Sequence, residues 1–484
     1  MHEHNRLIDY NWDGFLDFLR ELITFPSVRA DALPEKPFGE GVDACYRYML
    51  ERAKADGFEV FDADGWGGHA QWRGLQFDEN GTPTAASETL GIPVHLDVVP
   101  EGDGWSHPPY AAEMQDGRIY GRGASDNKGA VAAVYYALLA LKESGFVPSK
   151  NIRLIFGLDE ETGWSGMKKY FEKAPAPDFG FVPDAEFPAI HGEKGIMDFQ
   201  IAKKLTSSRE KGLVLTNLTG GNASNMVPDA ATAILTNEKS SGFESVKATL
   251  TEYRMKTGYN IRGRGIGKAF KIEATGVSAH GSRPENGKNA ISILMALLGE
   301  IGIANESVRE FIDFYNDYVG FENDGKALGI QFSDEPSGPL TLNCGLVEMD
   351  KEAAILTFNV RHPVTMKEDV VYEALLPLIH KLDVGLVKLD YKAPIYVPAS
   401  DPFIQTLMRV YRNITKDEES KPIVIGGGTY ARAIPNAVAF GPMFPNEPDC
   451  MHQADEYVDL NHIRKAMHIY ADAIYELTGG KENA

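Results

Sequence analysis

Two short apolar runs, separated by an Ala- and Leu-rich helical stretch, most constrain the fold of this chain. The runs are Leu90–Val99 and Ile152–Leu158, and the helical stretch is Lys128–Ser144. A strand–helix–strand order predicts an α/β sheet with helices packed on its faces. In such sheets the functional side chains gather at the carboxyl ends of the strands, in the loops that follow.

The pattern changes further along the chain in a way that predicts an inserted domain. From about Ile196 strand-like segments accompany only two predicted helices, and after Pro394 the α/β pattern returns. We therefore expect an α/β fold: a catalytic domain with a mixed sheet flanked by helices (1–195 and 392–484), interrupted by a large inserted α+β domain (196–391). Other predicted elements are the helices Gly14–Ile23, Gly41–Ala55, Asn289–Ile301, Asp369–Leu382, Pro402–Thr415 and Asn461–Leu477, and the strands Leu213–Leu218, Thr232–Leu235, Phe270–Ala274, Ala354–Val360 and Ala437–Phe440.

Charge and cysteine usage exclude several classes of protein. The chain has 48 Lys and Arg against 69 Asp and Glu, and no basic cluster, so neither nucleic acid nor an anionic membrane is an expected partner. Cys45, Cys344 and Cys450 form neither a disulfide framework nor a CxxC metal site. The N-terminus has no signal-peptide core, and the apolar stretch Val131–Leu141 is far shorter than the roughly 20 residues that span a bilayer. We expect a soluble cytoplasmic protein.

The first apolar run carries two polar residues, His95 and Asp97. Burying an imidazole and a carboxylate costs free energy unless both find partners. In a strand, residues i and i+2 point to the same side, so the carboxylate can accept one ring N–H and leave the other nitrogen free for a metal ion. A structural histidine satisfied by its neighbour explains these residues equally well.

Four further polar clusters lie where strands or loops are expected to end. Taken alone, Asp126 in G-R-G-A-S-D-N-K-G favours a helix N-cap, whereas the D-E-E run at Asp159–Glu161 favours metal binding, because adjacent carboxylates repel unless cations screen them. Pro183–Glu186 and Asp449–Gln453 read by themselves as solvated loops. Together the clusters supply two histidines and several carboxylates to one edge of the sheet, which fits two divalent ions.

Mixed nitrogen and oxygen ligands suit Zn²⁺, Mn²⁺ or Co²⁺ better than Ca²⁺ or Mg²⁺. A carboxylate can bridge two such ions, which lower the pKa of bound water and polarise a carbonyl group. One of the adjacent carboxylates Glu160 and Glu161 would then be left to act as a base.

The clusters occur in an order that resembles a known family. H-L-D-V-V-P, G-R-G-A-S-D-N-K-G, D-E-E-T-G, P-D-A-E-F-P and the late His452 are similar to the co-catalytic metallopeptidases that include aminoacylase, glutamate carboxypeptidase and the carnosinases. The resemblance spans nearly the whole chain and is strongest to bacterial PepV-type dipeptidases, through P-D-A-E-F-P, G-G-G-T-Y-A-R and V-A-F-G-P-M-F-P. The chain departs from the family at Val94, where glycine is usual, and we expect this to affect packing only.

The resemblance assigns a role to each residue of the expected metal site. It implies one metal ion on His95 and Asp184, a second on Glu161 and His452, a bridge at Asp126, Glu160 as general base and Asp97 as the partner that orients His95. It also implies a cis peptide bond at Asp126–Asn127.

The inserted domain resembles the lid of this family. The resemblance makes His280 the residue that stabilises the oxyanion, has Asn225 and Arg361 contact the substrate, and places Gly427, Gly428 and Thr429 in the pocket wall. Without the family, His280 reads as a loop histidine and Arg361 as a solvated surface arginine. A lid as long as 196–391 resembles the PepV type, in which one chain provides both halves of the site, so we expect a monomer.

The main functional hypothesis is a dipeptidase that uses two divalent metal ions, Zn²⁺ or Mn²⁺ with Co²⁺ as a further candidate, on unblocked dipeptides, β-alanyl dipeptides among the candidates. The alternative within the same chemistry is an N-acyl amino-acid hydrolase, which a recognition site for a free amino group would distinguish. A metal-binding protein without catalysis is the alternative of another class. Glu160 beside a full ligand set argues against it.

Overall fold

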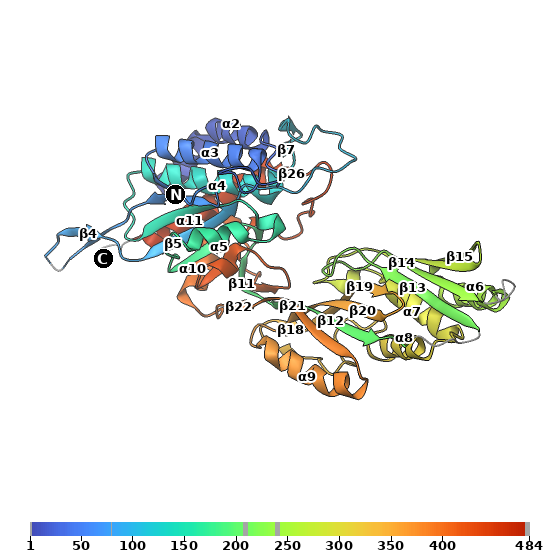
Figure 1. The fold of residues 1–484 in the computed structure, drawn as a ribbon. Helices are drawn as coiled ribbons and strands as arrows, with labels where there is room; N and C mark the ends of the chain where they lie inside the picture. The colour runs from blue at the N-terminus through green and yellow to red at the C-terminus, as the bar shows by residue number, and fades with distance from the viewer. Residues whose placement is uncertain (1, 79, 207–211, 238–242, 480–484) are drawn as a thin grey trace. The chain divides into compact units, whose positions relative to one another are not determined.

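The computed structural model describes residues 2–78, 80–206, 212–237 and 243–479. These residues form two compact units, each described here by itself (Figure 1). The first unit comprises Met1–Gly192, Tyr396–Ile423 and Gly428–Ala484, and the second comprises Glu193–Ile395 and Val424–Gly427. The domain limits predicted after residues 195 and 391 stay a prediction.

The first unit is built on a mixed sheet with the order β1-β2-β8-β5-β9-β24-β11. The neighbours β8, β5, β9 and β24 run parallel, whereas β1, β2 and β11 pair antiparallel with their neighbours. From Leu90 onward every residue of β5 is buried, as expected for a parallel strand covered on both faces. The strands are β1 (Glu59–Asp62), β2 (Gly68–Trp72), β5 (Thr89–His95), β8 (Asn151–Gly157), β9 (Phe179–Val182), β11 (Ala189–Glu193) and β24 (Ala437–Phe440).

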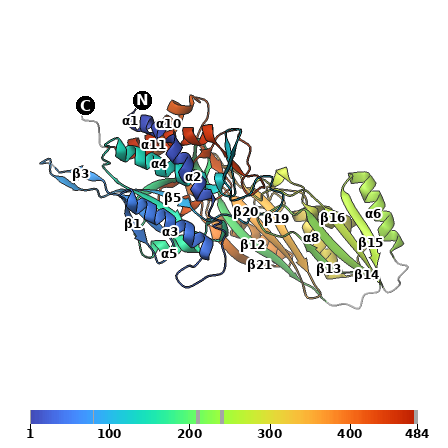
Figure 2. The same ribbon diagram turned by 90° about the horizontal axis from the view of Figure 1, so that it is seen from above.

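Helices of the first unit pack into one apolar core with this sheet. α4 is buried along almost its entire surface because Ala, Leu, Val and Tyr occupy 12 of its 15 positions, and α11 lies beside it in both views (Figures 1 and 2). The helices are α1 (Glu3–Tyr10), α2 (Trp12–Ile23), α3 (Glu40–Ala55), α4 (Gly129–Glu143), α5 (Ser165–Phe171), α10 (Pro402–Thr415) and α11 (Leu460–Thr478).

The second unit is an antiparallel sheet with the order β15-β16-β14-β13-β19-β20-β12-β21 and a separate core (Figure 2). Buried and half-buried residues alternate along β12, as expected where only one face of a sheet packs against helices. The strands are β12 (Gly195–Lys204), β13 (Leu213–Gly220), β14 (Ala230–Asn237), β15 (Asn260–Ile266), β16 (Ala269–Thr275), β19 (Thr341–Met349), β20 (Ala353–His362) and β21 (Gly385–Lys392). The helices are α6 (Glu244–Thr257), α7 (Ala290–Glu300), α8 (Glu306–Tyr318) and α9 (Glu368–Lys381).

The structure confirms the predicted α/β unit with a mixed sheet and the predicted α+β unit, and it corrects two details. The strand predicted to reach Val99 ends at His95, so Asp97 lies in the following loop. Two helices predicted in the second unit are α7 and α9, but α6 and α8 were missed. α6 buries only Val246, Leu250 and Tyr253, an apolar stripe too narrow for sequence periodicity to detect.

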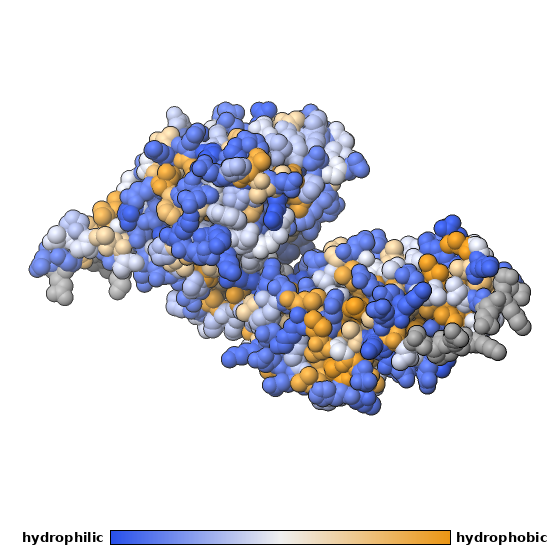
Figure 3. All heavy atoms as spheres, viewed as in Figure 1, coloured by the Kyte–Doolittle hydropathy of each residue, from blue (hydrophilic) through white to orange (hydrophobic). Residues whose placement is uncertain are grey.

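Among the described residues, no helix is both long and apolar enough to cross a lipid bilayer. On the visible face, hydrophobic residues are sparse over the first unit and more frequent over the second (Figure 3). Large apolar side chains are exposed on α9 and on the edge strand β21, namely Val370, Leu376, Val387 and Leu389.

The core of the first unit makes a prediction about stability. Leu154 in β8 is fully buried, so Leu154→Ala should lower the free energy of unfolding by about 2–5 kcal/mol through lost burial and a residual cavity. Leu75 in the same unit is 43% exposed, and Leu75→Ala should change it by less than about 0.5 kcal/mol. Urea unfolding of both variants measures the difference, and equal losses would contradict this account of the core.

Candidate metal centre

Three neighbouring parallel strands bring the first ligands together. β5 ends at His95, β8 is followed by Glu160 and Glu161, and β9 is followed by Asp184. Because β8, β5 and β9 are adjacent and parallel, their carboxyl ends meet at one edge of the sheet. This topology gathers residues that lie far apart in the sequence.

The ligand atoms form two groups, in each of which they lie within 4.8 Å of one another. One group is His95, Glu160 and Asp184, and the other is Asp126, Glu161 and His452. In the second group, His452 Nε2 lies 3.0 Å from Glu161 Oε1. Five of these six residues are the metal ligands that the resemblance implied, and the sixth, Glu160, is the residue that it implied as general base.

Asp126 connects the two groups. Its Oδ1 lies 2.9 Å from His95 Nε2, and its Oδ2 lies 3.1 Å from His452 Nε2. The residue before α4 is Lys128, and both carboxylate oxygens of Asp126 face histidines, so the interpretation of Asp126 as an N-cap is wrong. The Asp126–Asn127 peptide bond is cis, as the resemblance implied.

Asp97 acts differently from what the sequence indicated. His95 Nδ1 donates to the main-chain carbonyl of Asp97 at 2.9 Å, whereas the Asp97 Oδ1 atom lies 3.5 Å away. The carbonyl therefore fixes the ring so that Nε2 faces Asp126. The Asp97 carboxylate instead accepts the main-chain N–H groups of Glu160 at 3.1 Å and Glu161 at 3.2 Å, which positions both glutamates.

The neighbouring Asp159 faces away from both groups. Its carboxylate accepts bonds from the Ser165 hydroxyl at 2.6 Å and the Gly166 N–H, so it anchors the start of α5. Of the three consecutive acidic residues, the second and third therefore enter the metal groups. The resemblance had assigned roles to Glu160 and Glu161 but none to Asp159.

Tyr430 packs against His95. The Tyr430 ring lies edge-on to the His95 ring with centroids 6.5 Å apart. A Cβ at Gly157 would lie 2.2 Å from the Tyr430 ring, so the last residue of β8 must be glycine for this ring to fit. Val94, in the same strand as His95, is fully buried in the core, and its expected effect on packing stays a prediction.

The electrostatics of the site fit divalent cations. Burial raises the pKa of Glu160 well above its usual value, and the Asp184 carboxylate raises it further. Burial also raises the pKa values of Asp184 and Glu161. Four half-buried carboxyl groups thus lie close together with only two imidazoles, which is unfavourable unless further positive charge balances them. The residues present fit two divalent ions of the kind that oxygen and imidazole nitrogen bind.

The predicted lid residues Asn225, His280 and Arg361 lie in the second unit. Of the predicted pocket wall, Gly427 belongs to the second unit, whereas Gly428 and Thr429 belong to the first. Arg361 is buried, and it donates from Nε to Asn359 Oδ1 and from Nη1 to the Gly426 carbonyl, both at 2.8 Å. The interpretation as a solvated surface arginine is therefore wrong. His280 lies in an exposed loop, where its Nδ1 is 2.6 Å from the Ser282 hydroxyl.

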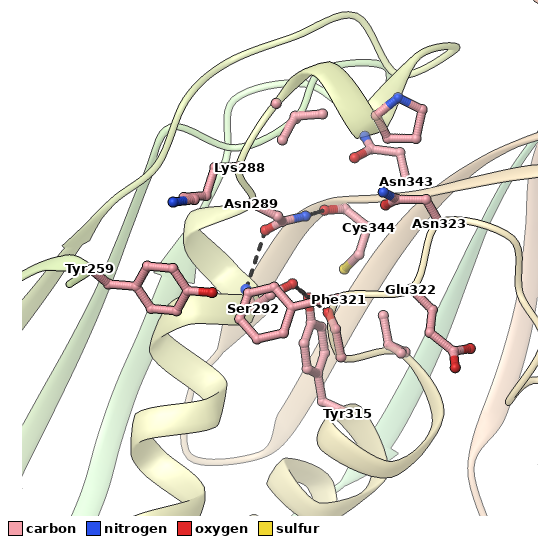
Figure 4. Close-up of a pocket in the computed structure, with 15 residues that line it drawn as sticks. Tyr259, Lys288, Asn289, Ser292, Tyr315, Phe321, Glu322, Asn323, Asn343 and Cys344 are labelled. Atoms are coloured by element: carbon pink, nitrogen blue, oxygen red, sulfur yellow. Dashed lines mark hydrogen bonds between the residues drawn. The ribbon is translucent and has the colours of Figure 1, made fainter. Parts of the chain in front are cut away.

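A cavity of about 140 Å³ lies within the second unit (Figure 4). Its polar side chains bond to their neighbours: Asn289 Nδ2 donates to the Cys344 carbonyl, and the Ser292 and Tyr315 hydroxyls are 2.8 Å apart. Asn343 in its wall donates to the carbonyls of Ser224 and Met226. These two hydrogen bonds hold the segment that carries Asn225 in place.

Comparison with known proteins identifies the family. The profile of Peptidase family M20/M25/M40 matches residues 91–476. The chain belongs to this peptidase family. Membership makes it a hydrolase whose chemistry depends on divalent metal ions, and it confirms the resemblance seen in the sequence.

Two curated relatives at 34–36% identity cover almost the whole chain. A Bacillus subtilis (strain 168) protein named "Putative dipeptidase YtjP" is 36% identical over 446 residues, which cover 92% of each chain. A Staphylococcus epidermidis protein named "Putative dipeptidase" is 34% identical over 478 residues, 98% of each chain.

Two solved structures share the fold. Human carnosine dipeptidase 1 aligns with a TM-score of 0.54 at 15% identity over 98% of each chain. Aminoacylhistidine dipeptidase from Vibrio alginolyticus aligns with a TM-score of 0.56 at 15% identity over 96% of each chain.

The charge balance at His452 predicts proton release on metal binding. Hydrogen bonds to Asp126 and Glu161 raise the pKa of His452 to about 10 in the metal-free protein, so the ring carries a proton at pH 8. A metal ion needs the neutral imidazole and must displace that proton, so affinity should rise with pH. Calorimetry of Zn²⁺ binding in buffers of different ionisation enthalpy should show about one proton fewer released by His452→Gln than by the wild type.

His107→Gln is the matched control for this titration, because His107 pairs with Glu113 outside both ligand groups. It should release as many protons as the wild type. Equal proton release from all three proteins would contradict the assignment of His452 as a metal ligand.

Proposed function

We propose that this protein is a dipeptidase with two divalent metal ions, which hydrolyses unblocked dipeptides. The observation that carries the proposal is Asp126, whose two carboxylate oxygens face histidines from distant parts of the chain. A shared carboxylate of this kind is what a two-metal hydrolytic site requires. The names of the relatives at 34–36% identity support dipeptides as substrates.

His95, Asp184, Asp126, Glu161 and His452 would hold the two ions, with Asp126 between them. When bound, the ions would polarise the scissile carbonyl and lower the pKa of a water molecule. The ligand set suits Zn²⁺, Mn²⁺ or Co²⁺.

Glu160 is the residue suited to move the proton. Its carboxyl group lies with the ligand atoms of His95 and Asp184 in the first group, and burial raises its pKa well above the usual value, which favours uptake of a proton. The Asp97 carboxylate holds the main chain at Glu160. Glu160 would accept a proton from the attacking water and pass it to the leaving amine.

Recognition of the substrate is assigned to the second unit. The Arg361 guanidinium is held in one orientation by Asn359 and the Gly426 carbonyl, which suits it to bind a substrate carboxylate. Asn359 in turn donates to Asp198, which also accepts from Ser224, next to Asn225. Arg361 and the Asn225 segment therefore share one hydrogen-bonded network.

We further propose that His280 stabilises the oxyanion and that Gly427 and Gly428 form part of the pocket wall. The chain would act as a monomer in the cytoplasm, where its three free cysteines stay reduced.

Adjacent glutamates allow a matched test of the proton shuttle. Glu160→Gln should lower kcat by about 10²–10⁴-fold while two metal ions remain bound, because only the shuttle is removed. Glu161→Gln, the same change one residue later, should instead reduce the metal content measured by mass spectrometry. Wild-type kcat in metal-loaded Glu160→Gln would disprove this mechanism.

The choice of substrate is tested on protein stripped of metal and restored with Zn²⁺, Mn²⁺ or Co²⁺ separately. Each form is assayed on pairs of free and N-acetylated dipeptides, with β-alanyl dipeptides in the same series. We expect higher kcat/KM for the free member of each pair. Higher values for the acetylated members would overturn the dipeptidase assignment in favour of an N-acyl amino-acid hydrolase.

A further inference from the structure

Glu456 is a buried carboxylate next to the metal centre that the proposed mechanism does not use. It is 1% exposed, lies four residues after His452 and immediately precedes β26 (Tyr457–Asp459). β26 pairs with β7 (Arg118–Tyr120), and the Glu456 carbonyl accepts the Gly121 N–H at 2.9 Å. The segment that follows His452 is therefore hydrogen-bonded to the segment that leads to Asp126.

The Glu456 carboxylate accepts four hydrogen bonds from that second segment. Oε2 accepts from Arg122 Nη1 at 2.7 Å and from the Gly123 N–H at 3.0 Å. Oε1 accepts from the Ser125 N–H at 2.9 Å and from the Asp126 N–H at 3.1 Å. One side chain thus holds the main chain of Asp126 itself.

The backbone on the other side of this contact needs such support. His452 and Asp455 both have left-handed conformations, with φ of +61° and +57°. This region is disfavoured for residues other than glycine and persists only where surrounding contacts hold it. Glu456 lies at the end of this turn, so its carboxylate links the segment that carries His452 to the segment that carries Asp126.

Stability alone does not explain a buried ion pair at this place. Arg122 is also 1% exposed, and its Nη2 donates to the Glu101 carbonyl at 3.0 Å. Removing two charges from water often costs as much as their attraction returns, and apolar residues of similar size frequently replace such pairs without loss of stability. Groups that orient metal ligands, by contrast, directly affect metal affinity.

We propose that Glu456 is a positioning residue of the metal centre, which sets the bridging carboxylate of Asp126 and the imidazole of His452 at the separation that two metal ions require. It does not bind metal or substrate itself. This inference rests on the two-metal site of the proposed function, but not on the identity of the substrate.

The neighbour Asp455 provides a matched control. Its carboxylate accepts from the Ser106 hydroxyl at 2.7 Å and from main-chain N–H groups of Ser106 and His107, so it anchors the same turn to a loop that carries no metal ligand. Asn tolerates the left-handed conformation, so Asp455→Asn removes the same charge without backbone strain.

The test measures metal binding by the metal-free full-length protein. Zn²⁺ affinity and stoichiometry are determined by competition with a chromophoric chelator, alongside the melting temperature. Glu456→Gln should bind one or both ions about 10–100-fold more weakly than the wild type, whereas Asp455→Asn should bind both with wild-type affinity. A purely structural role would lower the melting temperature of Glu456→Gln and leave metal affinity unchanged, which would overturn the inference.

Glu456→Asp keeps the experiment decisive if the amide variant does not fold. It retains the charge that pairs with Arg122, but the shorter side chain cannot reach all four donors. It should also lose metal affinity, and wild-type affinity in this variant would overturn the inference.

Assays on dipeptides separate this inference from the proposed function. If Glu456→Gln loses metal while the wild type binds two ions but cleaves no dipeptide, the positioning role stands and the proposed function fails. If the wild type cleaves dipeptides and both Glu456 variants bind metal normally, the positioning role alone fails.

Discussion

The rest of the metal centre depends on one carboxylate that faces two histidines. Asp126 lies within hydrogen-bond distance of His95 through one oxygen and of His452 through the other. The carboxylates of both groups are half-buried and close together, so they repel one another unless cations occupy the space between them. The surrounding hydrogen bonds therefore serve to hold negative groups at a spacing that they would not adopt by themselves.

Those supporting bonds come mainly from the main chain. The Asp97 carbonyl orients His95, and the Asp97 carboxylate holds two successive N–H groups at Glu160 and Glu161. The Glu456 carboxylate likewise accepts two successive main-chain N–H groups, at Ser125 and Asp126. Because a main-chain donor moves only with its whole loop, such contacts fix ligand positions more firmly than contacts between flexible side chains would.

Much of the fold and of the site could be predicted because the signals are local. Helices with a clear apolar pattern, such as α4 and α10, match their predicted limits within a residue, and family motifs mark all six residues of the ligand groups. Helix α6 and the end of strand β5 were not predicted correctly, and both errors have physical causes. α6 presents a narrow apolar stripe, and β5 ends early because its chain turns at His95 so that the Asp97 carboxylate can reach the N–H groups that follow β8.

Local chemistry in the chain was enough to specify which residue types could bind metal, and the order of the motifs indicated the family. Only the folded chain decided how they act together, because the parallel order β8-β5-β9 is what makes three distant loops adjacent. Tertiary contacts also decided that Asp159 faces away and that Arg361 is buried. Glu456 shows the reason most clearly: its partners lie more than 300 residues earlier, and no local pattern reports a contact across that distance.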